Sequence, residues 1–320
     1  MKLSVIIPVF NSERTVGAAI DSVLSQSIPP DEVLIMDDGS TDGTPSILRS
    51  YGSRIRVFRQ ENGGVASGRN FLLKQAQGNL IAFLDADDLW HPEYLAMQQK
   101  LFERYPDAVA FFTGHADFFG YGPFRWRRER LDYYRGVEII ESVSFFKRYN
   151  QDPGPFASPS YLCVPRKVFS EMNMDPFPVR VSGADDFFLC NYLPLIGPVV
   201  YAPEIAVAYR ITEQAQSANL VKSLSLSVQA FQLLKEHYSH FGNTQLADLL
   251  SQYLASRRRQ YGKRLMGAGE IGEARTQFRY SMNDSDNLLS VTKSAVLLFF
   301  STITVLQPLW PSGQREWEEQ

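Results

Sequence analysis

The first 115 residues alternate between short segments rich in Val, Ile and Leu and longer segments with apolar residues at helical spacing. We expect strands at 3–9, 33–36, 55–58, 80–84 and 108–112, with helices between them. Strands that alternate with helices favour parallel pairing, because each connecting helix packs on a face of the sheet. The sequence therefore predicts an α/β fold with a mostly parallel sheet and helices on both faces.

The alternation fades after residue 113. Residues 118–135 are rich in aromatic side chains and arginine and are expected to form an irregular insertion, and 152–159 reads as a loop because of its prolines. From residue 218 the pattern becomes helical, with helices expected at 220–237, 244–265 and 271–282. We therefore expect a first domain at 1–217, with halves 1–115 and 116–217, and a helical C-terminal region at 218–320.

Composition excludes several classes of protein. The chain has 320 residues, of which 44% are hydrophobic and 21% are charged, as in ordinary globular proteins. A net charge of −3 argues against nucleic-acid binding. The two cysteines, Cys163 and Cys190, form no disulfide framework and fit a reducing compartment. Since neither a signal peptide nor an apolar run of transmembrane length is visible, we expect a cytoplasmic protein.

One C-terminal segment raises the question of membrane contact. Residues 288–306 are mostly apolar, although Lys293 and several Ser and Thr residues interrupt them. One interpretation is a core helix of the C-terminal region. The other is a helix that lies in the membrane interface, because Trp310 follows and basic residues precede it. The second interpretation predicts peripheral contact with the inner face of a membrane through residues 288–310.

Carboxylates follow two of the expected strands. Asp85, Asp87 and Asp88 come directly after residues 80–84, and Asp38 follows 33–36. Closely spaced carboxylates repel one another, and their hard oxygens suit Mg²⁺ or Mn²⁺ held together with a substrate phosphate. The alternative is that these residues only cap the next helix or form a turn. Because the carboxyl ends of parallel strands meet at one edge, we expect Asp38, Asp85 and Asp87 to converge.

Two expected helix starts carry further candidates. Glycines at 63, 64 and 68 precede Arg69, and a glycine turn into a helix can bring backbone N–H groups and an arginine to a phosphate. A plain helix start is the alternative. Asp185 and Asp186 begin another helical run, where they either cap the helix or accept a proton from an attacking hydroxyl.

Taken together, these motifs resemble the family 2 glycosyltransferases. Four segments carry the close resemblance, which covers about residues 1–115: 5–11, 37–42, 64–70 and 83–88. A looser resemblance continues to about residue 217 and includes Asp185, Asp186, Tyr209 and Arg210. The resemblance implies a GT-A (Rossmann-like) fold, a nucleotide-diphosphate sugar as donor and a divalent cation, Mn²⁺ or Mg²⁺, as cofactor.

The resemblance also implies a role for each candidate. Asp186 would be the general base, with Asp185 beside it, and Asp87 would bind the metal. The nucleotide sugar would be bound by Pro8, Phe10, Asn11, Asp38, Arg69 and Asp85, with Asp38 at the nucleobase and Arg69 near the diphosphate or ribose. The implied reaction moves a sugar, with a UDP-sugar as the favoured donor, to a hydroxyl of a glycan or lipid-linked glycan. It would be a metal-assisted single displacement with inversion, in polysaccharide biosynthesis of the cell envelope. The alternative is a non-catalytic nucleotide-sugar-binding protein that acts through its helical C-terminus.

The chain departs from the family pattern at the general base and at the metal. The family usually has Glu-Asp where this chain has Asp185-Asp186, so the second carboxylate is kept. Many relatives have a histidine at the position of Thr212, where it can help to bind the metal. Gly68 also stands where alanine is common, which is a conservative change.

Overall fold

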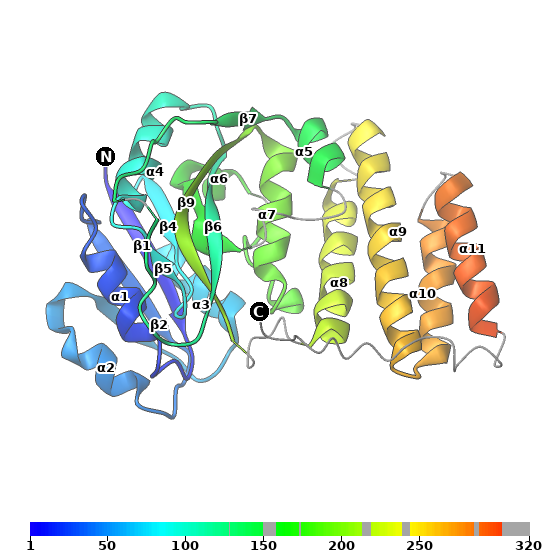
Figure 1. Ribbon diagram of the computed structural model, residues 1–320, viewed down its shortest axis with the longest axis horizontal. Coiled ribbons are helices and arrows are strands. Elements are labelled where there is room, and N and C mark those ends of the chain that lie inside the picture. The colour runs from blue at the N-terminus through cyan, green and yellow to red at the C-terminus, as the bar shows by residue number, and fades with distance from the viewer. Residues whose placement is uncertain are drawn as a thin grey trace. The chain divides into compact units, whose positions relative to one another are not determined.

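The computed structural model describes residues 1–127, 129–149, 158–172, 174–212, 219–238, 244–284 and 288–302. The chain divides into two compact units, Met1–Ala218 and Asn219–Gln320 (Figure 1). The boundary expected at residue 217 falls within 213–218, which lie outside the described residues. The division of the first domain into halves at residue 115 stays a prediction.

One mixed sheet forms the centre of the first unit. In the described part of the chain its strands are β1 (Leu3–Val9), β2 (Glu32–Asp37), β3 (Arg56–Arg59), β4 (Leu80–Phe83), β5 (Leu89–Trp90), β6 (Ala110–Phe119), β7 (Glu138–Ile140), β8 (Leu162–Pro165) and β9 (Val199–Ile211). Their order is β3-β2-β1-β4-β8-β6-β9-β5, and β7 also pairs with β9. Strands β1 to β4 pair in parallel, as do β6 and β9, whereas β8 runs antiparallel between the two groups.

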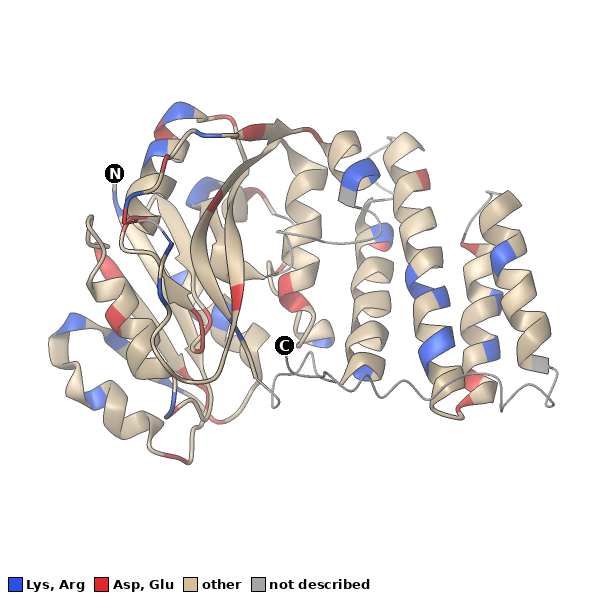
Figure 2. Ribbon diagram, in the orientation of Figure 1, with Lys and Arg blue, Asp and Glu red and all other residues tan. Residues whose placement is uncertain are grey.

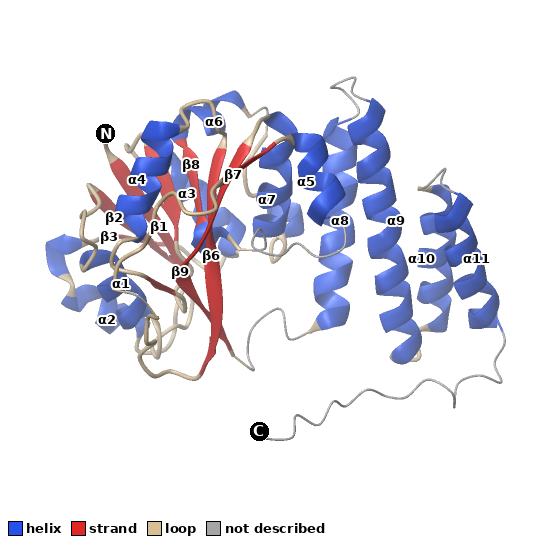
Figure 3. Ribbon diagram, turned by 45° about the horizontal axis from the view of Figure 1, so that its top comes forward, coloured by secondary structure: helices blue, strands red, loops and turns tan. Residues whose placement is uncertain are grey.

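Helices cover both faces of this sheet, as the alternation predicts. They are α1 (Val16–Leu24), α2 (Thr44–Ser50), α3 (Val65–Gln75), α4 (Tyr94–Arg104), α5 (Ser142–Tyr149), α6 (Arg166–Glu171) and α7 (Asp185–Ile196). One face packs on α1, α2 and α4. Leu3, Val5, Ile7 and Val9, the alternate residues of β1, lie in one buried cluster with apolar side chains of these three helices. The second packs on α3, whose Gly68 lies against Met36 of β2. The predicted α/β class is confirmed (Figure 3).

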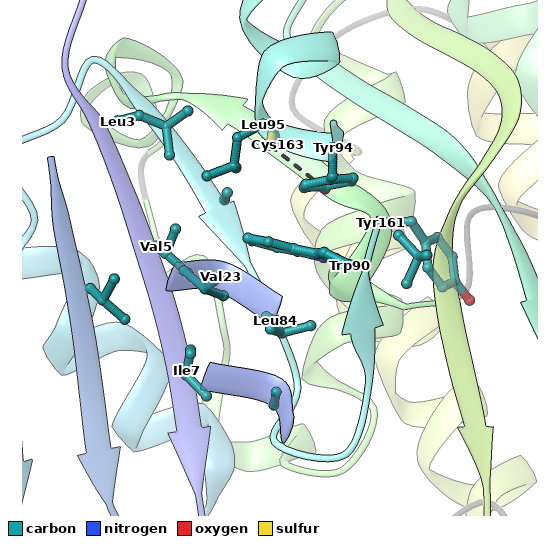
Figure 4. Close-up of a cluster of buried hydrophobic side chains, with 14 of the residues drawn as sticks. Leu3, Val5, Ile7, Val23, Leu84, Trp90, Tyr94, Leu95, Tyr161 and Cys163 are labelled. Carbon is teal, nitrogen blue, oxygen red and sulfur yellow. Dashed lines mark hydrogen bonds between the residues drawn. The ribbon is translucent and has the colours of Figure 1, made fainter. Parts of the chain in front are cut away.

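Residues 85–88, which follow β4 and contain three aspartates, are called the acidic turn below. The core next to this turn is rich in aromatic side chains. Trp90 stacks on Tyr94 with ring centroids 4.3 Å apart, and the hydroxyl of Tyr94 lies 3.7 Å from the sulfur of Cys163 (Figure 4). The indole N–H of Trp90 donates to the backbone oxygen of Ser160 at 2.7 Å. These contacts join β5 to α4 and to the segment just before β8, and they join α4 to β8. The segments on both sides of the acidic turn are therefore fixed.

The strands beyond residue 113 are longer than the sequence predicts. Strand β6 continues to Phe119 and pairs with β9 along its whole length, with register shifts between Thr113 and His115. Residues 118 and 119 are therefore strand rather than insertion, whereas 120–127 and 129–137 contain neither helix nor strand, as expected. The loop predicted at 152–159 lies, up to residue 157, outside the described residues.

The second unit is helical, as predicted. Its helices in the described part of the chain are α8 (Leu220–Tyr238), α9 (Thr244–Gly267), α10 (Ile271–Asn283) and α11 (Leu288–Thr302). Helices α9 and α10 approach closely at Gly262, where the ring of Phe278 occupies the space of a side chain. No helix in the described ranges is both long enough and apolar enough to cross a membrane.

Candidate functional site

The acidic turn after β4 is fixed to the end of β9. The N–H of Asp85 donates to the hydroxyl of Ser160 at 3.1 Å, and the N–H of Asp88 donates to the backbone oxygen of Asp85 at 3.2 Å. Arg210 of β9 donates its N–H to Asp88 Oδ1 at 2.8 Å and its Nε–H to the backbone oxygen of Asp87 at 2.6 Å. The turn is thereby presented in one conformation at the carboxyl edge of the sheet.

Arg69 joins two of the predicted site carboxylates. Its Nη2 lies 2.5 Å from Asp85 Oδ1 and its Nη1 lies 2.8 Å from Asp185 Oδ2. Arg69 is 3% exposed and Asp185 is fully buried. Burial alone would lower the pKa of Arg69, but Asp85, Asp185 and Asp186 raise it above its ordinary value. The predicted contact of Arg69 with a diphosphate or ribose stays a prediction, because both of its terminal nitrogens already hold carboxylates here.

Two other carboxyls resist ionisation. Burial and the neighbouring Asp85 raise the pKa of Asp87 to about 6. Burial and the neighbouring Asp185 raise the pKa of Asp186 to about 7, and its Oδ1 accepts the N–H of Phe187 at 2.6 Å. Asp186 is partly exposed, so a ligand can reach it. A cation would favour the ionised form of Asp87, and Asp186 can take up a proton near neutral pH.

The donor set fits a hard divalent cation only if a substrate contributes ligands. Among the described residues there is no group of three or more His, Cys, Asp or Glu side chains that could hold a metal ion. Asp87, with Asp85 as its neighbour, would bind a cation through one or two carboxylates. Mg²⁺ and related ions in phosphate-transferring sites are held in this way, with waters and substrate phosphate as the other ligands.

The predicted nucleotide residues gather at the ends of β1 and β2. Both oxygens of Asp38 accept hydrogen bonds, with Oδ1 bound by the N–H of Gly63 and Oδ2 by the N–H of Gly64, each at 2.8 Å. The side chain of Gln60 also donates to Asp38, at 2.6 Å. Asp38 therefore positions the glycine turn before α3. A contact with a nucleobase, as predicted, would use the remaining acceptor capacity of this carboxylate.

Residues 8–11 continue this edge of the sheet. Pro8 is buried, whereas the ring of Phe10 is 46% exposed. Asn11 has a φ of 46°, and its Oδ1 accepts the N–H of Thr41 at 2.9 Å. This left-handed backbone suits Asn, whose side chain bonds locally. The arrangement turns the chain at the end of β1 and leaves the ring of Phe10 accessible to a planar ligand.

The glycine turn also lies close to the segment before α7. A side chain at Gly64 would place its Cβ 3.0 Å from the hydroxyl oxygen of Ser182, and the φ of 85° at Gly64 also favours glycine. The N-terminus of α3 and the start of α7 are thus in contact. The structure brings Asp85, Arg69 and the pair Asp185-Asp186 into one cluster and places Asp38 beside it through the glycine turn.

Sequence reasoning did not identify several residues beside this cluster. Ser160 binds the acidic turn, and Tyr161 stacks on His115 with centroids 4.5 Å apart. Burial and then Asp88 raise the pKa of Tyr209 above its ordinary value. Ser160 and Tyr161 follow a proline-rich stretch with no motif of its own, so no signal pointed to them. The looser resemblance already included Tyr209 and Arg210 but gave neither of them a role in the site.

A separate pocket lies beside β6. His115 faces the aromatic residues of the carboxylate cluster, while the next residue, Ala116, lines a pocket of about 450 Å³ together with Phe124, Trp126 and Glu204. None of the predicted site residues is among the described residues that line this pocket. We therefore centre the candidate site on the carboxylates.

Comparison with known proteins places these features in a family. Residues 4–171 match the family model described as glycosyl transferase family 2. The putative teichuronic acid biosynthesis glycosyltransferase TuaG of Bacillus subtilis is 42% identical over 118 residues, which are 36% of this chain and 46% of that protein. A protein of Escherichia coli, UDP-Glc:alpha-D-GlcNAc-diphosphoundecaprenol beta-1,3-glucosyltransferase WfgD, is 44% identical over 98 residues, or 30% of this chain and 39% of that protein. The chain thus spans less than half the length of these curated relatives.

Solved structures with the same fold have low sequence identity. S. aureus TarS 1-349 in complex with UDP-GlcNAc superimposes with a TM-score of 0.69 and 17% identity, covering 94% of this chain and 89% of that one. The mannosyltransferase PcManGT from Pyrobaculum calidifontis, in complex with GDP-Man and Mn²⁺, gives 0.57 and 18%, covering 96% and 82%. These likenesses support the GT-A fold. Because the family model matches residues 4–171, which are more than half of the chain, the chain belongs to glycosyl transferase family 2.

Proposed function

We propose that this protein transfers a sugar from a nucleotide-diphosphate donor to a hydroxyl of a glycan or lipid-linked glycan, with UDP as the favoured nucleotide. One observation carries the proposal. Arg69 joins Asp85 to Asp185, and this contact sets Asp186 beside the acidic turn that contains Asp87. A donor diphosphate at the turn and an acceptor hydroxyl at Asp186 would then be neighbours, as a single displacement with inversion requires.

Asp186 is the general base of this proposal. Its pKa of about 7 means that the carboxylate is available near neutral pH and still holds a proton well. A base whose pKa lies close to the working pH combines availability with proton affinity. Asp186 would take the proton of the acceptor hydroxyl as that oxygen attacks the anomeric carbon. Asp185 would act through Arg69 and would keep the base in position.

Asp87 is the proposed metal ligand, with Mn²⁺ or Mg²⁺ as the cation. When bound, the cation would neutralise the negative charge that develops on the leaving diphosphate. The chain's own contribution is the fixed acidic turn. Arg210 holds the backbone oxygen of Asp87 and the carboxylate of Asp88, so the carboxylate of Asp87 needs little rearrangement to bind a ligand.

The nucleotide would lie along the ends of β1 and β2. The exposed ring of Phe10 offers a face for a base, Pro8 and Asn11 shape the wall, and Asp38 supplies an acceptor oxygen. Two comparisons favour uracil and a lipid-linked acceptor: the TarS complex contains UDP-GlcNAc, and WfgD is named for UDP-Glc and a diphosphoundecaprenol acceptor. We therefore propose a role in cell-envelope polysaccharide synthesis at the cytoplasmic side of a membrane.

The test is calorimetric binding of UDP, GDP, CMP and dTDP, each with and without Mn²⁺. The wild type should bind UDP in a Mn²⁺-dependent manner, and Asp87→Ala should lose this dependence. Asp107→Ala is the matched control, since it removes an exposed aspartate outside the site. Absence of binding of every nucleotide by folded protein would refute the proposal.

A second measurement separates an enzyme from a non-catalytic binding protein. Once the nucleotide is known, a panel of its sugars is incubated with protein, and release of the nucleoside diphosphate is followed. Asp186→Asn should bind the donor with wild-type affinity but lower the rate of transfer by about 10² to 10⁴-fold. Equal rates for the wild type and Asp186→Asn would assign the base elsewhere, and donor binding without any turnover in the wild type would support a binding protein.

A further inference from the structure

Helix α11 places serines on its inner face, toward α9 and α10. Ser294 is fully buried and Ser301 is 5% exposed. The hydroxyl of Ser281 on α10 donates to that of Ser294 at 2.7 Å, and Arg259 of α9 donates to the hydroxyl of Ser290, also at 2.7 Å. These polar contacts add to the packing of Leu297 and Leu298 on the apolar core of the second unit in holding α11.

The outer face of α11 carries the large apolar side chains. We define this outer face as Leu288, Leu289, Val296, Phe299 and Phe300, whose exposed fractions range from 46% to 79%. Thr292 and Lys293 lie exposed among them. Leu297 and Leu298 form the usual apolar stripe toward the core of the second unit, so the outer face is a second apolar face on the same helix. A contiguous exposed apolar face of this kind marks an interaction surface.

Charge indicates which surface this face meets. Residues 219–302 contain ten Lys and Arg but six Asp and Glu, although the whole chain has a net charge of −3 (Figure 2). Lys263, Arg264 and Arg279 of α9 and α10 are exposed, as is Lys293 within the outer face itself. An apolar helix face that carries a lysine, in a unit with further exposed basic residues, is the pattern that binds an anionic membrane interface.

We propose that the outer face of α11 docks onto the surface of an anionic lipid bilayer. The helix would lie in the plane of the interface, with Val296 and Phe300 in the headgroup and acyl boundary. The stem of Lys293 would lie along the apolar surface, while its ammonium group reaches lipid phosphates. The helix does not span the bilayer. This proposal does not rest on the proposed function, because it concerns only the second unit.

The experiment is flotation of the full-length protein with vesicles of two compositions. One contains phosphatidylglycerol and phosphatidylethanolamine in equal parts, and the other contains phosphatidylcholine alone. The wild type should float with the first and much less with the second. Val296→Ser/Phe300→Ser should lower the ratio of vesicle-bound to free protein about ten-fold or more, because two apolar side chains no longer leave water on binding. Lys293→Gln should lower it about five-fold at low salt and less at high salt.

The matched control is Val179→Ser/Leu220→Ser, which removes two similarly exposed apolar side chains, 54% and 49%, outside α11. It should float as the wild type does. Circular dichroism and nucleotide binding establish that each variant is folded, so that failure of docking is distinct from failure of the proposed function. Folded wild type that floats with neither vesicle overturns the proposal. A dimer in sedimentation analysis that Val296→Ser/Phe300→Ser abolishes, without flotation, would assign the face to a second copy of the chain and also overturn it.

Discussion

Replacement of Arg69 by methionine tests the electrostatics of the site most directly. Methionine keeps a long unbranched side chain but removes the guanidinium group that lies 2.5 Å from Asp85 and 2.8 Å from Asp185. Arg69 is 3% exposed and Asp185 is fully buried. The carboxylate of Asp185 then keeps the N–H of Gly183, which donates to its Oδ1 at 2.8 Å, but no cation among the described residues. Arg69→Met therefore leaves a buried, uncompensated negative charge.

The expected loss of stability is about 3 kcal/mol in the free energy of unfolding. Removal of one partner of a buried ion pair costs about 3–5 kcal/mol, and we take the lower end because the side chain of Asp85 is 24% exposed. The matched control is Lys100→Met. Lys100 pairs with Glu103 at 3.1 Å on α4, with both side chains almost half exposed. Such a surface pair contributes about 1 kcal/mol at most.

Urea denaturation at pH 7 measures both variants against the wild type. The midpoint of Arg69→Met should fall while the slope stays constant, since the surface exposed on unfolding is the same. If Arg69→Met lost no more stability than Lys100→Met at neutral pH, the cluster would not depend on this ion pair and the reasoning would be refuted.

Further predictions concern Asp186, Gly262 and Thr212. The pKa of about 7 at Asp186 predicts that the transfer rate rises between pH 6 and 8 in an initial-rate profile. Since burial disfavours the charged form, Asp186→Asn should also raise the free energy of unfolding above pH 7, by about 1–2 kcal/mol after allowance for partial exposure, with no gain below pH 4. Gly262→Ala would place its Cβ 2.5 Å from the ring of Phe278 and should cost about 1–3 kcal/mol in urea denaturation, whereas Gly272→Ala, with nothing within 4 Å, should cost nothing. Thr212→His should lower the Mn²⁺ concentration needed for half-maximal nucleotide binding in calorimetry, because imidazole is an additional metal ligand; an unchanged value would mean that another group already completes the site.

The first part of the fold could be predicted because three of its strands, β1, β2 and β4, are almost entirely buried. Every residue of β1 is buried, so the strand reads as a continuous apolar run that ends where the chain reaches the edge of the sheet. Strand β4 is also buried throughout, and the end of its apolar run predicted that Asp85 and Asp87 lie at the edge of the sheet. Strand β9 lacked such a signal. It contains Pro203 and Glu204 at an irregularity in its pairing with β6, which interrupts the apolar run.

The partners within the site could not be predicted. Arg69 and Asp185 are 116 positions apart, and no local pattern indicates that they meet. The resemblance therefore assigned Arg69 to a diphosphate or ribose and Asp38 to a base, and the alternatives from the sequence were a plain helix start and a turn. In the structure both side chains also bind protein groups, namely two carboxylates for Arg69 and the N–H groups of Gly63 and Gly64 for Asp38.

These contacts bear on which carboxyl of the pair acts as the base. Asp185 is fully buried, pairs with Arg69 and accepts the N–H of Gly183, so its oxygens are committed to the protein. Asp186 is partly exposed, and burial with the charge of Asp185 raises its pKa to about 7. Adjacent carboxyls held in such different environments divide into an acid-base group and a fixed charge. The arrangement favours Asp186 as the proton acceptor and Asp185 as the group that, through Arg69, ties α7 to the acidic turn. The exchange of the family's Glu-Asp for Asp185-Asp186 thus shortens the side chain at the positioning residue and leaves the proposed base unchanged.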